Sequence, residues 1–178
     1  MQKEDILRYL KILNKKLKQK GIKGQIGLFD GTVMCLAFNA RKSTKDIDAI
    51  FKPKEQIYNF AKEIAYEQNL PENWLNDSVK GFLSDNNQMK VFKNMSHLTI
   101  YIPSPEYMLA MKCISARLEG STDVEDVIFL INHLNIKSVE EVLTIIQKYF
   151  PPKRVLPKTK YFLIELFQQN KVGEKNEN

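Results

Sequence analysis

The chain has 178 residues, of which 43% are hydrophobic and 27% are charged, and its formal net charge is +6. This composition is typical of a globular protein and argues against intrinsic disorder. No apolar run is long enough to cross a bilayer and the start of the chain does not resemble a signal peptide, so we expect a soluble, cytoplasmic protein. Cys35 and Cys113 each lie in an apolar segment, which favours buried thiols over a disulfide or a metal site.

The excess of positive charge is concentrated in two segments. Their cationic residues are Lys15, Lys16, Lys18, Lys20 and Lys23, and Lys153, Arg154, Lys158 and Lys160. Phosphate contacts dominate nucleic-acid affinity, so these segments are compatible with RNA or nucleotides as partners. Lysine-rich helix faces that are merely solvated are an equally simple explanation.

In chain order, the first elements are a helix, a strand and a turn. Apolar residues recur at helical spacing over residues 3–20, which predicts an amphipathic helix. Residues 25–29 predict a short strand, the Asp30-Gly31 pair predicts a turn, and residues 32–38 predict a buried helix.

The next strand carries Asp46 and Asp48, and a helix over residues 54–68 follows it. A connection over residues 71–77 contains Trp74, which either anchors this loop to the core or stacks on a base. The remaining elements of this part are a short helix near Val79 and two strands, at residues 89–92 and 98–102.

The last part of the chain predicts helices. Ser104 and Pro105 have the residue types that begin a helix, which should run to about Leu118. Capping boxes at Thr122 and Ser138 predict helices over residues 123–134 and 139–149, and a final helix is expected at 160–169. We therefore expect an α+β protein with a small mixed sheet flanked by helices over residues 1–103, a helical region packed on it over 104–170, and a flexible tail over 171–178.

The segment Arg41–Phe51 is the most informative part of the chain. Asp46 and Asp48 are separated by one apolar residue, and in a strand this spacing places both carboxylates on one face. Two carboxylates on one face could share a divalent metal ion such as Mg²⁺, which prefers oxygen ligands. The alternative is that both aspartates lie at the end of a strand on a solvated face.

A strand, a glycine turn at Gly31, a helix and then a strand with D-x-D resemble the pattern of the nucleotidyltransferase superfamily. The downstream segment 107–117, followed by Asp123 and Asp126, resembles the helical signature of AbiEii-type toxins, the nucleotidyltransferases of type IV toxin-antitoxin pairs, and of their uncharacterised relatives. Together these features cover most of residues 25–135. The resemblance implies the nucleotidyltransferase fold.

The resemblance also implies roles for the residues of the first motif. Asp46 and Asp48 would be the catalytic, metal-binding residues, holding Mg²⁺ against the β- and γ-phosphates of a nucleoside triphosphate while a hydroxyl attacks the α-phosphorus. Gly31 and the amide of Thr32 would lie close to the phosphates, at the N-terminus of a helix, and the Thr32 hydroxyl could add a hydrogen bond.

The helical signature implies three further nucleotide-binding residues. Lys112 would be a counter-charge for the triphosphate. Arg117 or Asp126 would complete the nucleotide pocket or hold the two parts of the protein together. Lys112 could instead extend to the surface from an apolar helix, and Asp126 lies in a first helical turn, where acids are favoured without any function.

Two positions depart from the family pattern. Asp30 stands where the family has the first glycine of a pair, and its charge would weaken triphosphate binding by roughly 1–4 kcal/mol, unless it reaches the metal or caps the following helix. Residues 98–102 carry no acid to serve as the usual third carboxylate, which leaves Asp77 or Asp85 as substitutes. His97 lies at a strand entrance and could approach the site, although we favour a structural role.

The sequence therefore favours a Mg²⁺-dependent nucleotidyltransferase that moves a nucleoside monophosphate from a nucleoside triphosphate to an RNA, such as a tRNA end, or to a protein hydroxyl. The resemblance adds a toxin-like role and a cognate antitoxin as partner. The alternative is a catalytically silent protein of the same fold that binds nucleotide, RNA or a protein partner. A third possibility is a small interaction module without a nucleotide site.

Overall fold

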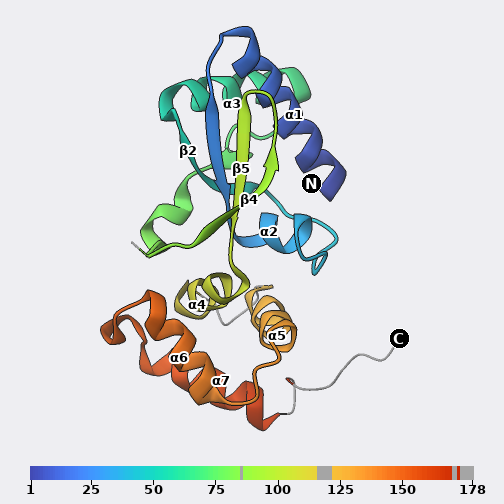
Figure 1. The fold of residues 1–178 in the computed structure, drawn as a ribbon. Helices are drawn as coiled ribbons and strands as arrows, with labels where there is room; N and C mark the ends of the chain where they lie inside the picture. Colours follow the sequence, from blue (N-terminus) through green and yellow to red (C-terminus); the bar gives the residue numbers. More distant parts are fainter. Residues whose placement is uncertain (85, 116–121, 170–171, 173–178) are drawn as a thin grey trace. The chain divides into compact units, whose positions relative to one another are not determined.

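We describe a computed structural model of the chain, which covers residues 1–84, 86–115, 122–169 and 172. The chain forms two compact units (Figure 1). The first comprises Met1–Gly81 and Met89–Pro103, and the second comprises Phe82–Gln88 and the chain from Ser104 onward. Residues 82–88 thus belong to the second unit, although the sequence places them within the first 103 residues.

The first unit contains a mixed sheet, which confirms the α+β expectation. Within the described residues the sheet has five strands in the order β3-β2-β1-β5-β4. Strand β1 pairs antiparallel with β2 and parallel with β5, β2 pairs parallel with β3, and β4 pairs antiparallel with β5. The strands are β1 (Gly24–Leu28), β2 (Ile47–Lys52), β3 (Leu75–Asn76), β4 (Met89–Asn94) and β5 (Leu98–Pro103).

Helices α1 (Lys3–Gln19) and α3 (Lys54–Gln68) pack side by side against this sheet (Figure 1). The apolar positions of α1 that are buried follow a helical period and are Ile6, Tyr9, Leu10, Leu13 and Leu17. Each such side chain contributes roughly 1.5–3 kcal/mol when removed from water. Lys16 also bridges the two helices, because its Nζ lies 2.9 Å from Glu63 and 2.7 Å from Glu67. This lysine of the basic segment is therefore structural.

The connection between α3 and η1 (Ser78–Phe82) contains β3, a strand that the sequence does not predict. Trp74 precedes β3 and is 1% exposed. Its indole N–H donates to the backbone carbonyl of Ala61 at 2.9 Å, and its ring meets that of Tyr9 edge to face at 5.5 Å. Trp74 is thus an anchor of the loop, and the prediction that it could stack on a base is wrong.

The second unit is helical in its described part, with α4 (Pro105–Ser115), α5 (Asp123–His133), α6 (Val139–Tyr149), η2 (Pro152–Arg154) and α7 (Pro157–Gln168). Ser138 caps α6 as predicted, since its Oγ accepts from Glu141 N–H at 3.2 Å. Thr122 is the N-cap residue of α5 but makes no side-chain cap bond. The final helix begins at Pro157, whose fixed φ suits a first helical position. Residues 116–118, expected at the end of α4, lie outside the described residues.

Both cysteines are free and buried, which confirms the prediction of two thiols. Burial raises the pKa of Cys113 to about 12 and also raises the pKa of Cys35. In the described part of the chain, no helix has both the length and the apolar character that crossing a membrane requires.

Candidate functional site

The two aspartates of the D-x-D motif lie at the start of β2. Asp48 is within the strand, and Asp46 immediately precedes it. The prediction that both belong to the strand is therefore wrong for Asp46, which lies one residue before its start. Their spacing in extended backbone directs both side chains to the same face. The hydroxyls of Thr32 and Thr44 donate to the backbone carbonyl of Asp46 at 3.2 and 3.1 Å. This carbonyl is therefore fixed from two sides.

The backbone of Asp48 is fixed by the strand before the glycine turn. Its carbonyl accepts from Phe29 N–H at 2.9 Å, which continues the pairing of β1 with β2 beyond Leu28. The turn at Asp30 and Gly31 therefore lies directly beside the aspartate pair, as the sequence predicts.

Both carboxylates accept hydrogen bonds from the segment that follows them in the sheet. Asn76 Nδ2 donates to Asp46 Oδ2 at 3.1 Å, and Ser78 Oγ donates to Asp48 Oδ1 at 2.9 Å. The parallel pairing of β2 with β3 places Asn76 opposite Asp48. The sequence gives no indication of these two residues, because β3 is only Leu75–Asn76 and carries no motif.

The pair concentrates negative charge. Burial raises the pKa of Asp48, the charges of Asp46 and Asp30 raise it further, and the hydrogen bonds from Ser78 and Asn76 oppose the rise. Burial and like charges both disfavour the ionised carboxylate, whereas a bound cation would favour it. A divalent ion with oxygen ligands would therefore suit this place.

Asp77 differs from these two aspartates in its partners. Its Oδ2 lies 3.0 Å from Lys54 Nζ and 2.5 Å from Lys80 Nζ, and its Oδ1 accepts from the hydroxyl of Tyr58. Hydrogen bonds from Lys80, Tyr58 and Lys54 hold the pKa of Asp77 well below its usual range. Two ammonium groups already neutralise its charge, and a role of Asp77 as the third carboxylate stays a prediction. Asp85, the other substitute, lies outside the described residues.

The glycine turn requires Gly31 for space. A Cβ added there would lie 2.7 Å from Thr44 Oγ1 and 3.1 Å from a guanidinium nitrogen of Arg41. The positive φ of this turn, 50°, belongs to Asp30, a residue type that tolerates the left-handed region better than most. Asp30 is the first residue of α2 (Asp30–Leu36) and is not its N-cap, so the prediction that it caps this helix is wrong.

Thr32, also expected near the phosphates, is fully buried. Its hydroxyl is engaged with the carbonyl of Asp46, as described above. Its observed contribution is therefore to hold the start of β2, and nucleotide binding by its amide stays a prediction.

Lys112 and Asp126 lie together in the second unit. Lys112 Nζ is 2.9 Å from Asp126 Oδ2 and 2.6 Å from Asp123 Oδ1, and the Lys112 and Asp126 side chains are each 1% exposed. Breaking a buried ion pair by removing one partner typically costs about 3–5 kcal/mol, so this cluster fixes α4 to α5. Lys112 does not extend to the surface. Arg117 lies outside the described residues, and nucleotide binding by these three residues stays a prediction.

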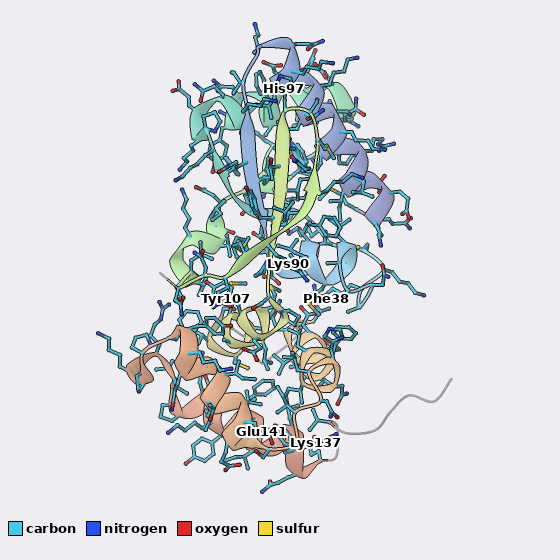
Figure 2. All side chains as sticks on the ribbon, in the orientation of Figure 1. Phe38, Lys90, His97, Tyr107, Lys137 and Glu141 are labelled. Carbon is cyan, nitrogen blue, oxygen red and sulfur yellow. The ribbon has the colours of Figure 1, made fainter. Side chains whose placement is uncertain are left out.

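His97 lies at the end of the sheet where β1 and β5 begin (Figure 2). Its carbonyl accepts from Gly24 N–H at the start of β1, whereas the glycine turn follows the end of β1. His97 therefore cannot approach the site along the neighbouring strand. The structural role favoured by the sequence agrees with this position.

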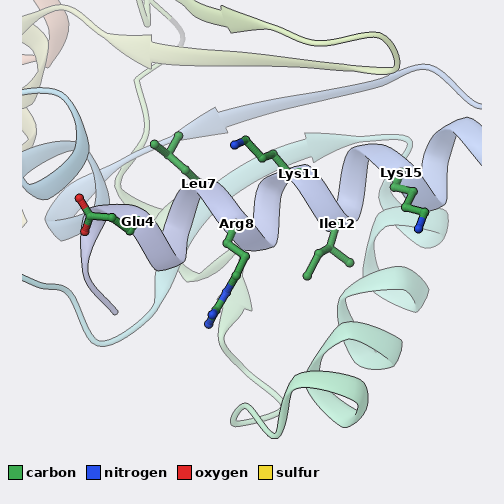
Figure 3. A pocket seen from close by; sticks show the side chains of 6 residues that line it. All are labelled: Glu4, Leu7, Arg8, Lys11, Ile12 and Lys15. Carbon is green, nitrogen blue, oxygen red and sulfur yellow. The ribbon is translucent and has the colours of Figure 1, made fainter.

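The outer face of α1 carries a basic depression (Figure 3). It is lined by Glu4, Leu7, Arg8, Lys11, Ile12 and Lys15. Three cations and one acid line it, and Arg8 also pairs with Asp5, whose Oδ1 lies 3.3 Å from an Arg8 guanidinium nitrogen. The start of α1 lies against the loop that carries Asp46, because Thr44 N–H donates to the carbonyl of Met1 at 2.9 Å.

Comparison with known proteins identifies one family. A family model described as "Nucleotidyltransferase of unknown function (DUF6036)" matches residues 8–162, which is most of the chain. No curated protein and no solved structure matches.

Proposed function

Because the chain belongs to this family of nucleotidyltransferases, we propose that it transfers a nucleoside monophosphate from a nucleoside triphosphate to a hydroxyl group with the help of Mg²⁺. Asp46 and Asp48 are the proposed metal-binding, catalytic residues. The observation that supports these roles is the pair of carboxylates on one face at the start of β2, held by hydrogen bonds from Asn76 and Ser78.

The donor set fits a divalent ion. Within the described residues, the hydrogen-bond donors to the two carboxylates are the Asn76 amide and the Ser78 hydroxyl, which are neutral. The carboxylates therefore keep their charge for a cation. When bound, Mg²⁺ would offset the charge of the triphosphate and polarise the reacting phosphoryl group.

The glycine turn is the proposed position of the phosphates. Gly31 has no side chain to obstruct this turn, and the guanidinium of Arg41 lies against it. Arg41 thus provides a positive charge next to the aspartate pair, and guanidinium groups bind phosphate oxygens in bidentate fashion. The charge of Asp30 at the same turn opposes triphosphate binding unless a cation lies between them.

RNA is the proposed acceptor. Arg8, Lys11 and Lys15 form a basic stripe on α1, and this helix begins beside the loop of Asp46. A polyanion that followed this stripe would have its phosphates near cations and one end near the site. A protein hydroxyl is the other acceptor that the chemistry allows.

A toxin-like role with a cognate antitoxin, in the cytoplasm, is part of the same proposal. Growth of a bacterial host that expresses the wild-type chain, compared with one that expresses Asp46→Asn/Asp48→Asn, tests it. Arrest by the wild type alone supports the role, and equal growth contradicts it.

The activity itself is tested by transfer of label from each of the four α-³²P nucleoside triphosphates, with Mg²⁺, to total RNA and to total protein. Label in RNA supports the full proposal. Label in protein alone supports nucleotide transfer but makes a protein hydroxyl the acceptor. Triphosphate binding without label favours the catalytically silent protein, a reading that the absence of any acid in β5 supports. If Mg²⁺ and triphosphate together leave the melting temperature unchanged, the chain has no nucleotide site.

A further inference from the structure

The segment Asn76-Asp77-Ser78 lies beside the aspartate pair, and its role goes beyond the family pattern. We propose that Asn76 and Ser78 are positioning residues, which hold the Asp46 and Asp48 carboxylates in the orientation that receives the metal ion. This inference rests on the proposed function, because it assigns the metal to that pair.

The first argument is the register. Strand β3 pairs parallel with β2 and places Asn76 opposite Asp48. Each donor then lies within hydrogen-bond distance of one carboxylate, since Asn76 reaches Asp46 at 3.1 Å and Ser78 reaches Asp48 at 2.9 Å. The donors Asn76 and Ser78 are two residues apart in the sequence, and so are the acceptors Asp46 and Asp48.

The second argument is that the donors are themselves oriented. Ser78 N–H donates to Asn76 Oδ1 at 3.0 Å, which leaves the NH₂ group of Asn76 directed at Asp46. Because the Asn76 oxygen accepts this hydrogen bond, the side-chain amide cannot flip its oxygen and NH₂ group without losing it. The backbone N–H of Ser78 thus orients the Asn76 amide, and this amide donates to one oxygen of the Asp46 carboxylate.

The third argument is the alternation of charge along the segment. Asp77, between the two donors, binds Lys54 and Lys80. Its neighbours supply neutral donors to the aspartate pair. The two lysines thus bind Asp77 and hold the segment in place. Neutral donors fix a carboxylate without competing with a cation for its charge.

The chemical consequence concerns metal affinity. A carboxylate that has lost its hydrogen-bond donor rotates more freely and must be ordered again when the ion binds. Residues that donate hydrogen bonds to metal ligands typically contribute 10–100-fold to metal affinity or to activity. We expect Asn76→Ala and Ser78→Ala each to weaken metal binding about tenfold or more.

The test measures binding of Mn²⁺, a paramagnetic substitute for Mg²⁺, by the whole chain using electron paramagnetic resonance. The variants are Asn76→Ala, Ser78→Ala and Ser78→Thr, which keeps a hydroxyl. The control is Asn73→Ala, an exposed residue of the same type three positions upstream of Asn76. Melting temperatures of all variants are recorded beside the dissociation constants.

The proposal expects a tenfold or larger rise in the dissociation constant for both alanine variants, near wild-type binding for Ser78→Thr, and no change for Asn73→Ala. Unchanged affinity in Asn76→Ala and Ser78→Ala overturns it. If Asp46→Asn/Asp48→Asn binds Mn²⁺ as well as the wild type, the metal site is elsewhere and the proposal also falls. If wild type binds Mn²⁺ but transfers no nucleotide, only the proposed function fails and the positioning role is retained.

Discussion

Replacing Gly31 by alanine should destabilise the protein through the loop that carries the aspartate pair. The added Cβ would lie 2.7 Å from Thr44 Oγ1, so Thr44 must move. Movement breaks the hydrogen bond of 3.1 Å from Thr44 to the carbonyl of Asp46, which contributes about 1 kcal/mol. Overpacking adds about 1–2 kcal/mol. Arg41, whose guanidinium is at 3.1 Å from the same position, is long enough to withdraw.

We therefore expect Gly31→Ala to lose about 2–3 kcal/mol of unfolding free energy in urea titrations, which corresponds to about 4–12 °C in melting temperature for a chain of this size. Gly81→Ala is the matched control, because a Cβ there would meet no heavy atom within 4 Å. It should change stability by less than about 0.5 kcal/mol.

A double variant isolates the cause. Thr44→Ala alone should cost about 1 kcal/mol, and combined with Gly31→Ala it should cost less than the sum of the two single changes, because the hydroxyl that obstructs the new methyl group is gone. Strict additivity, or a Gly31→Ala variant as stable as Gly81→Ala, would refute the reasoning.

Three other predictions follow from single contacts. Trp74→Phe should lose about 2–3 kcal/mol in urea titrations, because the buried carbonyl of Ala61 loses its donor and a cavity remains; stability within 0.5 kcal/mol of wild type would contradict this. The pKa of Asp77 is lower in the folded chain than in the unfolded one, so its ionised form stabilises the fold above about pH 4 and this contribution fades as the pH falls further. Asp77→Asn should therefore melt below wild type at pH 7 and approach it on acidification, whereas a constant difference would exclude the carboxylate as the cause. Burial raises the pKa of Cys113 to about 12, so neither this thiol nor the buried Cys35 should react with a disulfide reagent at pH 8 until guanidinium unfolds the chain; rapid reaction of the native protein would be inconsistent with this.

Much of the fold could be predicted because local signals agree with tertiary packing. The apolar period of α1 matches its buried face, and α3 begins after Pro53 and ends before Asn69, whose φ is 52°. The extended D-x-D spacing also predicted that Asp46 and Asp48 face the same way. These features depend on residues close together in sequence, where propensity and burial pattern coincide.

The rest depends on contacts that are distant in sequence. Asn76 and Ser78 belong to a two-residue strand and the turn after it, and only the pairing with β2 shows that they meet the aspartates. The role of Gly31 also differs from expectation, because the positive φ lies at Asp30 and the glycine is needed for the approach of Thr44. No local sequence pattern predicts that the loop with Thr44 packs against the turn at Gly31.

The most direct measurement is transfer of α-³²P label to RNA in Mg²⁺ by wild type, Asp46→Asn/Asp48→Asn and Asn73→Ala. The third variant removes an exposed side chain of the neighbouring loop that has no part in the proposed site. We expect label with the wild type and Asn73→Ala and at least a hundredfold less with the double variant, because the proposal assigns the metal ion to Asp46 and Asp48. Equal label from the double variant and the wild type would show that the reaction takes place elsewhere.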